Sequence, residues 1–197
     1  MLTLGMDSAY KNLVLGLYDD EHLIDGIAKE AFKKQSECIF PELNDLLKRN
    51  HTDYADLDRV IITDGPGSYT GIRIAMTIAK VLCTQMPIEL DCISTMQLYA
   101  GMETGNVLLD ARGHRAYAAH VENGSVQGQT LILPVEEIPA WLDAHPGKLF
   151  GDGYLVDRPA DHSDLLENLI QVPHRKIDNV HALVPQYLKA SDAYKKA

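Results

Sequence analysis

The residues with the clearest chemical potential lie in one glycine-rich stretch, Asp-Gly-Pro-Gly-Ser-Tyr-Thr-Gly-Ile-Arg, from residue 64 to residue 73. An apolar run precedes it, and a helical pattern from Tyr69 to about Gln85 follows. A strand, a glycine turn and a helix N-terminus in this order are typical of anion-binding sites, because backbone N–H groups and the helix dipole point at the ligand. Gly67 and Ser68 are therefore candidate cofactor-binding residues.

Known phosphate-binding motifs fit this stretch poorly. A Walker loop has Lys and then Ser or Thr after its last glycine, whereas Ile72 and Arg73 follow Gly71. The alternative is a packing corner, in which Pro66 and Gly67 form the centre of a type II turn and Ser68 caps the helix. The residues assigned to this structural turn are Gly65, Pro66, Gly67, Ser68, Thr70 and Gly71.

The remaining reactive side chains form no catalytic pattern. The eight histidines include neither an HxxxH nor an HExxH pair, and His174 and His181 are spaced too loosely to indicate a metal site. Ser68 has no neighbour in sequence that would serve as its general base. Asp7 follows an apolar strand pattern and is a third candidate for binding a cofactor, although a turn-capping role explains it as well. We expect no catalytic residue, no metal site and no resident cofactor.

The elements that must position these residues occur in a repeated order. Each half has a strand ending in aspartate, two more strands, a helix, another strand and a glycine turn, so that Asp7 corresponds to Asp110. This order predicts an α/β protein of two lobes with mixed sheets and a cleft between them, residues 1–102 and a smaller lobe of residues 103–197. One extended sheet with an appended subdomain is the alternative. Strands are expected at 2–6, 13–18, 22–29, 57–63, 88–93, 107–109, 116–121, 126–133 and 149–150, and helices at 36–48, 69–85, 94–102, 135–144, 162–169 and 179–184.

The predicted helix of residues 69–85 has two apolar faces, although a helix that covers a sheet needs only one. Gly71, Ala75 and Ala79 form a stripe of small residues, and Ile74, Ile78 and Val81 form the second face. We expect Ile78 and Ala79 to point outward. We interpret the second face as a protein interface, with support from the helix of residues 36–48, whose N-cap we expect at Ser36. The expected interface residues are Ile39, Leu43, Gly71, Arg73, Ile74, Ala75, Ile78 and Ala79.

Composition restricts the partners and the compartment. The 197 residues carry a formal net charge of −10, which disfavours wide contact with nucleic acid. Lys33, Lys34 and the terminal Lys195 and Lys196 are too few to reverse this, so another subunit is expected to hold any RNA. No apolar run reaches the roughly 18 residues of a membrane helix. Three cysteines without a CxxC pair, and no visible signal peptide, favour a cytoplasmic protein with reduced thiols.

The glycine stretch also resembles the signature of the TsaB/YeaZ family. The resemblance extends over nearly the whole chain, with further similar stretches at residues 4–8, 110–112, 151–153 and 185–188 and at Tyr117. That family belongs to the actin/sugar-kinase/Hsp70-like (ASKHA) superfamily of ATPases, so the resemblance implies two duplicated RNase H-like lobes, the second reduced.

The resemblance implies a non-catalytic scaffold or activator of the bacterial complex that makes N6-threonylcarbamoyladenosine at position 37 of tRNAs reading ANN codons. It implies binding to the catalytic paralogue TsaD and to the ATPase TsaE, a homodimer when TsaD is absent, indirect contact with tRNA and no membrane contact. Whether ATP or ADP binds at the junction with TsaD is left open. A small ATP-dependent phosphotransferase, in which Asp7 would bind Mg·ATP, is the alternative. A glycoprotease would need a metal pair or a nucleophile–base pair that the sequence lacks.

Overall fold

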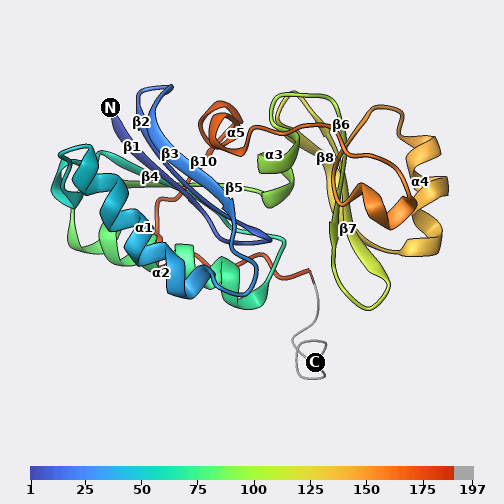
Figure 1. Cartoon of the computed structure of the whole chain (residues 1–197), viewed down its shortest axis with the longest axis horizontal. Coiled ribbons are helices and arrows are strands. Elements are labelled where there is room, and N and C mark those ends of the chain that lie inside the picture. Colours follow the sequence, from blue (N-terminus) through green and yellow to red (C-terminus); the bar gives the residue numbers. More distant parts are fainter. Residues whose placement is uncertain (189–197) are drawn as a thin grey trace.

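Two mixed β-sheets lie side by side along the long axis of the protein in a computed structural model that describes residues 1–188 (Figure 1). The expected charged tail with Lys195 and Lys196 lies outside these residues. The first sheet has six strands in the order β10-β5-β4-β1-β2-β3. Its strands β1, β4 and β5 are parallel to one another, and the other pairs are antiparallel. The bounds are β1 (Leu2–Asp7), β2 (Asn12–Asp19), β3 (His22–Glu30), β4 (Arg59–Thr63), β5 (Glu89–Ile93) and β10 (Arg175–Lys176).

Helices cover both faces of this sheet, because its central strands are apolar on both sides. On β2, Leu13, Leu15 and Leu17 point into one core and Val14 and Tyr18 into the other. The first core is closed by the long helices α1 (Gln35–Arg49) and α2 (Tyr69–Gln85), and the second by α3 (Thr95–Ala100) and α5 (Leu165–Gln171).

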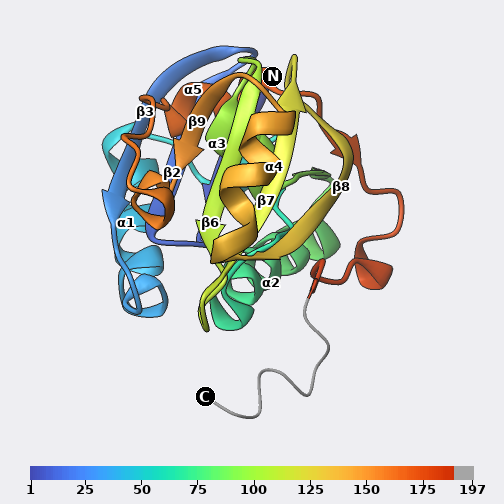
Figure 2. The ribbon, with the colours of Figure 1, turned by 90° about the vertical axis from the view of Figure 1, so that its right-hand side faces the viewer.

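The second sheet has four strands in the order β8-β7-β6-β9. One of its faces shares the core around α3 and α5, and the other is covered by α4 (Ile138–Ala144), which lies across it in Figure 2. Helices α3 and α5 therefore lie between the two sheets. The bounds of the strands are β6 (Gly105–Asp110), β7 (Arg115–Glu122), β8 (Ser125–Pro134) and β9 (Lys148–Gly151), and short 3₁₀ turns are η1 (Tyr54–Asp56), η2 (Val135–Glu137), η3 (Gly153–Val156) and η4 (Val180–Ala182).

The predicted α/β class with two mixed sheets is confirmed, and the alternative of one extended sheet is wrong. Within the second half, α5 packs against the first sheet and β10 pairs with β5, so the last part of the chain returns to the first half. The division at residue 102 stays a prediction. Among residues 1–188, no helix combines the length and the apolar character needed to cross a membrane.

Several local predictions need correction. Helix α1 begins at Gln35 with Lys34 as its N-cap, so Ser36 lies inside the helix. The helix expected at 162–169 begins only at Leu165, after Asp164, whose carboxylate caps it. The helix expected at 179–184 is a single 3₁₀ turn, and the two-residue strand β10 was not predicted because it is too short to show alternation.

Candidate functional site

The glycine turn packs directly against the loop that follows β1. The Ser68 N–H donates to the Ala9 carbonyl (2.7 Å), and the Ser8 hydroxyl donates to the Gly71 carbonyl (2.7 Å). A Cβ on Gly67 would overlap the Ala9 carbonyl oxygen, and one on Gly71 would overlap that of Ser8. The two glycines are thus required by the close approach of two backbone segments, which supports a packing corner beside the N-terminus of α2.

The predicted cap of this helix is confirmed, and the predicted turn type is wrong. The Ser68 side chain accepts a hydrogen bond from the Gly71 N–H (3.3 Å). A type II turn would need a positive φ at Gly67, but Gly65 is the residue with a positive φ (123°), and the bond between Gly65 and Pro66 is cis. Gly65 also faces the Gln186 carbonyl, where no Cβ would fit.

Replacing Gly71 by alanine should destabilise the protein by about 3 kcal/mol, because the added methyl group forces the Ser8 backbone away from α2. Urea unfolding followed by circular dichroism measures this change. Thr70→Ala is the matched control, since Thr70 is the preceding residue of the same helix and is exposed. Equal stability of the two variants would show that the backbone contact is not tight.

Asp7 lies at the end of β1 and is fully buried. Its Oδ1 atom accepts hydrogen bonds from the Ala9 N–H (3.0 Å) and from the Thr63 hydroxyl, so the expected turn-capping role is confirmed. Within residues 1–188, its Oδ2 atom has no hydrogen-bond partner. Burial raises the pKa of this carboxyl to about 6, because the charged form is poorly solvated.

This raised pKa gives stability a defined dependence on pH. The folded state holds the Asp7 proton up to a pH near 6, whereas the unfolded chain releases it near 3.8, so stability falls as pH rises through this window. Asp7→Asn should therefore be about 2 kcal/mol more stable than the original protein at pH 7.5, with the difference vanishing near pH 4. Urea unfolding at several pH values tests this, with Glu136→Gln as the exposed control. Parallel curves for Asp7→Asn and the original protein would contradict it.

A second group of side chains ties the two halves of the chain together. The Lys11 ammonium donates to Asp152 Oδ1 (2.6 Å), and the Tyr10 hydroxyl donates to Asp152 Oδ2. The Asp110 N–H also donates to Asp152 Oδ2 (2.7 Å), and burial together with the bond to Asp152 raises the pKa of Tyr10. We call Tyr10, Lys11, Asp110 and Asp152 the Asp152 clasp. It joins the loop after β1 to the last residue of β6 and to the turn after β9, the place where the sequence predicts a cleft.

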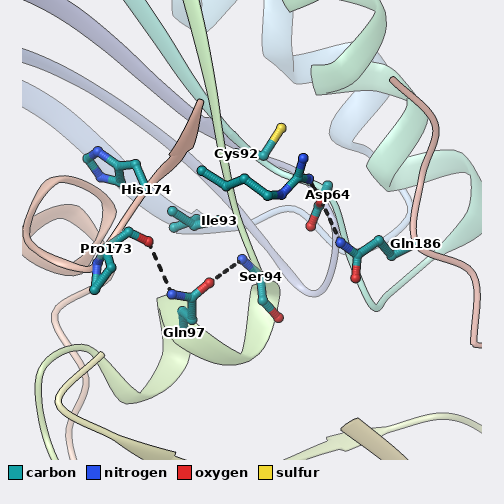
Figure 3. Close-up of a pocket in the computed structure, with 9 residues that line it drawn as sticks. Asp64, Cys92, Ile93, Ser94, Gln97, Pro173, His174 and Gln186 are labelled. Carbon is teal, nitrogen blue, oxygen red and sulfur yellow. Dashed lines mark hydrogen bonds and ion pairs between the residues drawn. The ribbon is translucent and has the colours of Figure 1, made fainter. Parts of the chain in front are cut away.

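Asp64, the first residue of the glycine stretch, forms hydrogen bonds with side chains from the last part of the described chain. It is buried and accepts hydrogen bonds from the side chains of Arg175 (2.6 Å) and Gln186 (2.9 Å). These residues border a cavity of about 200 Å³, shown in Figure 3. The cavity is smaller than most small-molecule sites, and its carboxylate is already paired with an arginine. The cavity is lined by Asp64, Cys92, Ile93, Ser94, Gln97, Pro173, His174, Arg175 and Gln186.

The expected interface residues have different positions on the protein. Arg73 is exposed and Ile74 is half-buried, whereas the other six lie in the chain's own core. The expectation that Ile78 and Ala79 point outward is wrong, since they are 7% and 0% exposed. The buried residues are Ile39, Leu43, Gly71, Ala75, Ile78 and Ala79.

The second apolar face of α2, which the sequence places at Ile74, Ile78 and Val81, is covered in part by the chain itself. Leu183, beside η4, belongs to the same core as Ile78, and the Lys80 ammonium donates to the His181 (3.1 Å) and Leu183 (3.0 Å) carbonyls. The rest of that face stays at the surface, with Ile74 half-buried and Val81 56% exposed. We call this side of the helix the α2 outer face. It consists of Thr70, Ile74, Thr77, Val81 and Thr84, with the exposed Arg73 beside it.

Sequence reasoning missed the roles of Tyr10, Lys11 and Arg175. Asp152 and Gln186 lie in stretches that carried the family resemblance, but nothing in those stretches indicated their partners, which lie more than 100 residues away. Among residues 1–188, no three His, Cys, Asp or Glu side chains gather in a group that could hold a metal ion. Asp7 caps a turn, and Asp64 and Asp152 join segments that are far apart in sequence.

The amino-acid sequence is similar to a family model and to a protein of known name. The family model TsaD, described as tRNA N6-adenosine threonylcarbamoyltransferase, matches residues 26–142. A Bacillus subtilis protein, tRNA threonylcarbamoyladenosine biosynthesis protein TsaB, is 24% identical over 228 residues, covering 100% of this chain and 97% of that protein.

Two solved structures share the fold. YeaZ from Pseudomonas aeruginosa has a TM-score of 0.70 at 21% identity, covering 87% of this chain and 89% of its own. A protein with similarity to peptidase YeaZ from the same species has a TM-score of 0.76 at 20% identity, covering 95% and 99%. At these identities, the similarity establishes the arrangement of the two sheets and their helices.

Proposed function

Because the chain belongs to the TsaD family, whose model describes tRNA N6-adenosine threonylcarbamoyltransferases, we propose that it is a non-catalytic subunit in the synthesis of N6-threonylcarbamoyladenosine. Its similarity along its whole length to a TsaB protein supports this pathway. The proposed product is the modified adenosine at position 37 of tRNAs that read ANN codons, made in the cytoplasm. The proposed role is to bind and activate the catalytic paralogue TsaD, with TsaE as a further component and a homodimer when TsaD is absent.

One observation carries the non-catalytic assignment. The loop after Asp7, where a nucleotide-binding protein would wrap phosphates, is packed onto the glycine turn through Ser8 and Ala9. The Asp152 carboxylate is engaged by Tyr10 and Lys11. The chain itself therefore engages both this loop and the Asp152 carboxylate, which favours a structural role.

The α2 outer face is the surface that we assign to TsaD. The five residues of this face carry no charge, and the exposed Arg73 lies beside them on the same helix. Val81 is 56% exposed, and on the neighbouring helix α1 Phe40 is 54% exposed. Depletion of charge with exposed apolar side chains is typical of the centre of a protein interface. A paralogue with the same fold has an equivalent pair of helices to place against it, and a second copy of this chain would compete for the same face.

The phosphotransferase alternative rests on one feature, the unpartnered Oδ2 atom of the buried Asp7. Mg²⁺ needs near-octahedral oxygen coordination, which one such atom does not provide. Calorimetric titration with Mg·ATP tests this alternative directly. Binding by the isolated chain, abolished in Asp7→Asn, would favour the phosphotransferase over the scaffold.

The proposed function is tested by co-expression with TsaD and TsaE from the same organism. We expect this chain and TsaD to elute together from a size-exclusion column, with a mass from light scattering that equals a defined assembly. A folded chain that elutes separately from both proteins at micromolar concentration would refute the proposed partnership.

A further inference from the structure

Two loops far apart in sequence form one basic and aromatic surface. The first joins β3 to α1, and the second is the turn between β6 and β7. The Arg112 guanidinium lies 5.9 Å from the centre of the Phe32 ring, and the Lys33 ammonium lies 5.5 Å from the same ring. We call this surface the basic patch, and it consists of Phe32, Lys33, Lys34, Arg112, His114 and Arg115.

The side chains of the basic patch are available to a partner. All six residues are exposed, and the Phe32 ring is 45% exposed. Within residues 1–188, none of the ion pairs involves Lys33, Lys34, Arg112 or Arg115, although acidic side chains are in excess in the chain. By contrast, Lys11, Lys29 and Arg49 each form an ion pair with a carboxylate. The patch therefore concentrates unpaired positive charge on an acidic protein.

The backbone presents these residues in an uncommon conformation. Lys33, Arg112 and His114 have φ angles of 63°, 62° and 55°, in the left-handed region that bulky residues seldom adopt. The second loop is fixed by the Arg112 N–H, which donates to Asp110 Oδ1 (2.6 Å), and by the Ala111 N–H, which donates to the Arg115 carbonyl (2.9 Å). Such a conformation costs free energy and is found preferentially at functional sites.

We propose that the basic patch contacts the phosphate backbone of the tRNA during its modification, with Phe32 available to stack on an unpaired base. This proposal rests on the proposed function, because the chain meets tRNA only in the complex with TsaD. Guanidinium groups pair with phosphate oxygens, and an aromatic ring beside cations is the usual platform for single-stranded nucleic acid. An acidic protein segment would use the cations but would leave the exposed ring without a role.

The size of the patch agrees with an auxiliary contact. Four cations can neutralise only a few phosphates, and a net charge of −10 opposes binding of tRNA by this chain alone. The basic patch therefore increases the affinity with which the complex with TsaD binds the tRNA. This direct contact departs from the expectation from the sequence that the chain meets tRNA only indirectly.

The test measures tRNA binding by the complex with TsaD at several salt concentrations. Lys33→Gln/Arg112→Gln should weaken binding about 10-fold at low salt and lower the slope of log affinity against log salt by about 2, one for each phosphate contact. Lys148→Gln/Lys176→Gln is the matched control, because it removes two exposed lysines that already pair with Glu103 and Glu89. The control should keep the slope of the original complex.

Three results would overturn the proposal. One is an unchanged slope in an intact complex. Another is loss of TsaD binding by the double variant, which would make the basic patch a protein interface. The third is weaker binding of ADP or ATP with unchanged binding of tRNA, which would make the patch a nucleotide site. If the original chain forms no complex with TsaD, that result refutes the proposed function, and it refutes this proposal as well.

Discussion

Asp152→Ala is expected to lower the free energy of unfolding by about 3 kcal/mol. Asp152 is 6% exposed and receives the Lys11 ammonium, the Tyr10 hydroxyl and the Asp110 N–H. Without its carboxylate, the Tyr10 hydroxyl loses its buried acceptor, and the Asp110 N–H keeps only the Tyr10 hydroxyl oxygen (2.8 Å). Lys11 can turn to water, because a third of its side chain is already exposed. Chemical unfolding followed by circular dichroism gives the size of the loss.

Asp152→Asn distinguishes the contribution of the charge to stability from the contribution of the hydrogen bonds. Asparagine keeps one acceptor oxygen but not the ion pair with Lys11, so its loss of stability should fall between those of the original protein and Asp152→Ala. If Asp152→Ala unfolds at the same denaturant concentration as the original protein, the clasp does not stabilise the junction of the two halves.

Ile74→Arg/Val81→Glu should weaken binding to TsaD at least 100-fold, because two central apolar contacts become charged and desolvated in the interface. Val81 is 56% exposed and Ile74 is half-buried, so the isolated variant should still fold. Surface plasmon resonance with immobilised TsaD measures the affinity. Leu131→Glu is the control, since Leu131 is 39% exposed on β8, in the other sheet. Equal affinity of both variants would exclude the α2 outer face as the docking surface.

Much of the fold could be predicted from local patterns. The bounds of α2 agree with the prediction because Ser68 caps its first turn, and the hairpin between β6 and β7 agrees because a glycine separates two apolar runs. Successive side chains of a strand point to opposite faces, and Leu13 and Val14 of β2 accordingly enter different cores. Periodicity therefore sufficed wherever an element is long enough to show it.

The pairing of distant segments could not be predicted. Asp64 meets Arg175 and Gln186 across more than 110 residues, and no local pattern encodes such a contact. The second apolar face of α2 is covered only in part, because the segment around Leu183 packs with Ile78 whereas Val81 is 56% exposed. Periodicity alone could not distinguish an internal partner from an external one. Gly67 and Gly71 looked like a phosphate turn because close approach to a ligand and close approach to another backbone segment both require glycine.

The most direct test of the account is the formation of N6-threonylcarbamoyladenosine in tRNA by TsaD and TsaE, measured with and without this chain. We expect product only when the chain is present, no product from the chain alone, and the same rate when it carries Asp7→Asn. Equal rates with and without the chain, or turnover by the chain by itself, would contradict the claim that it is a non-catalytic activator.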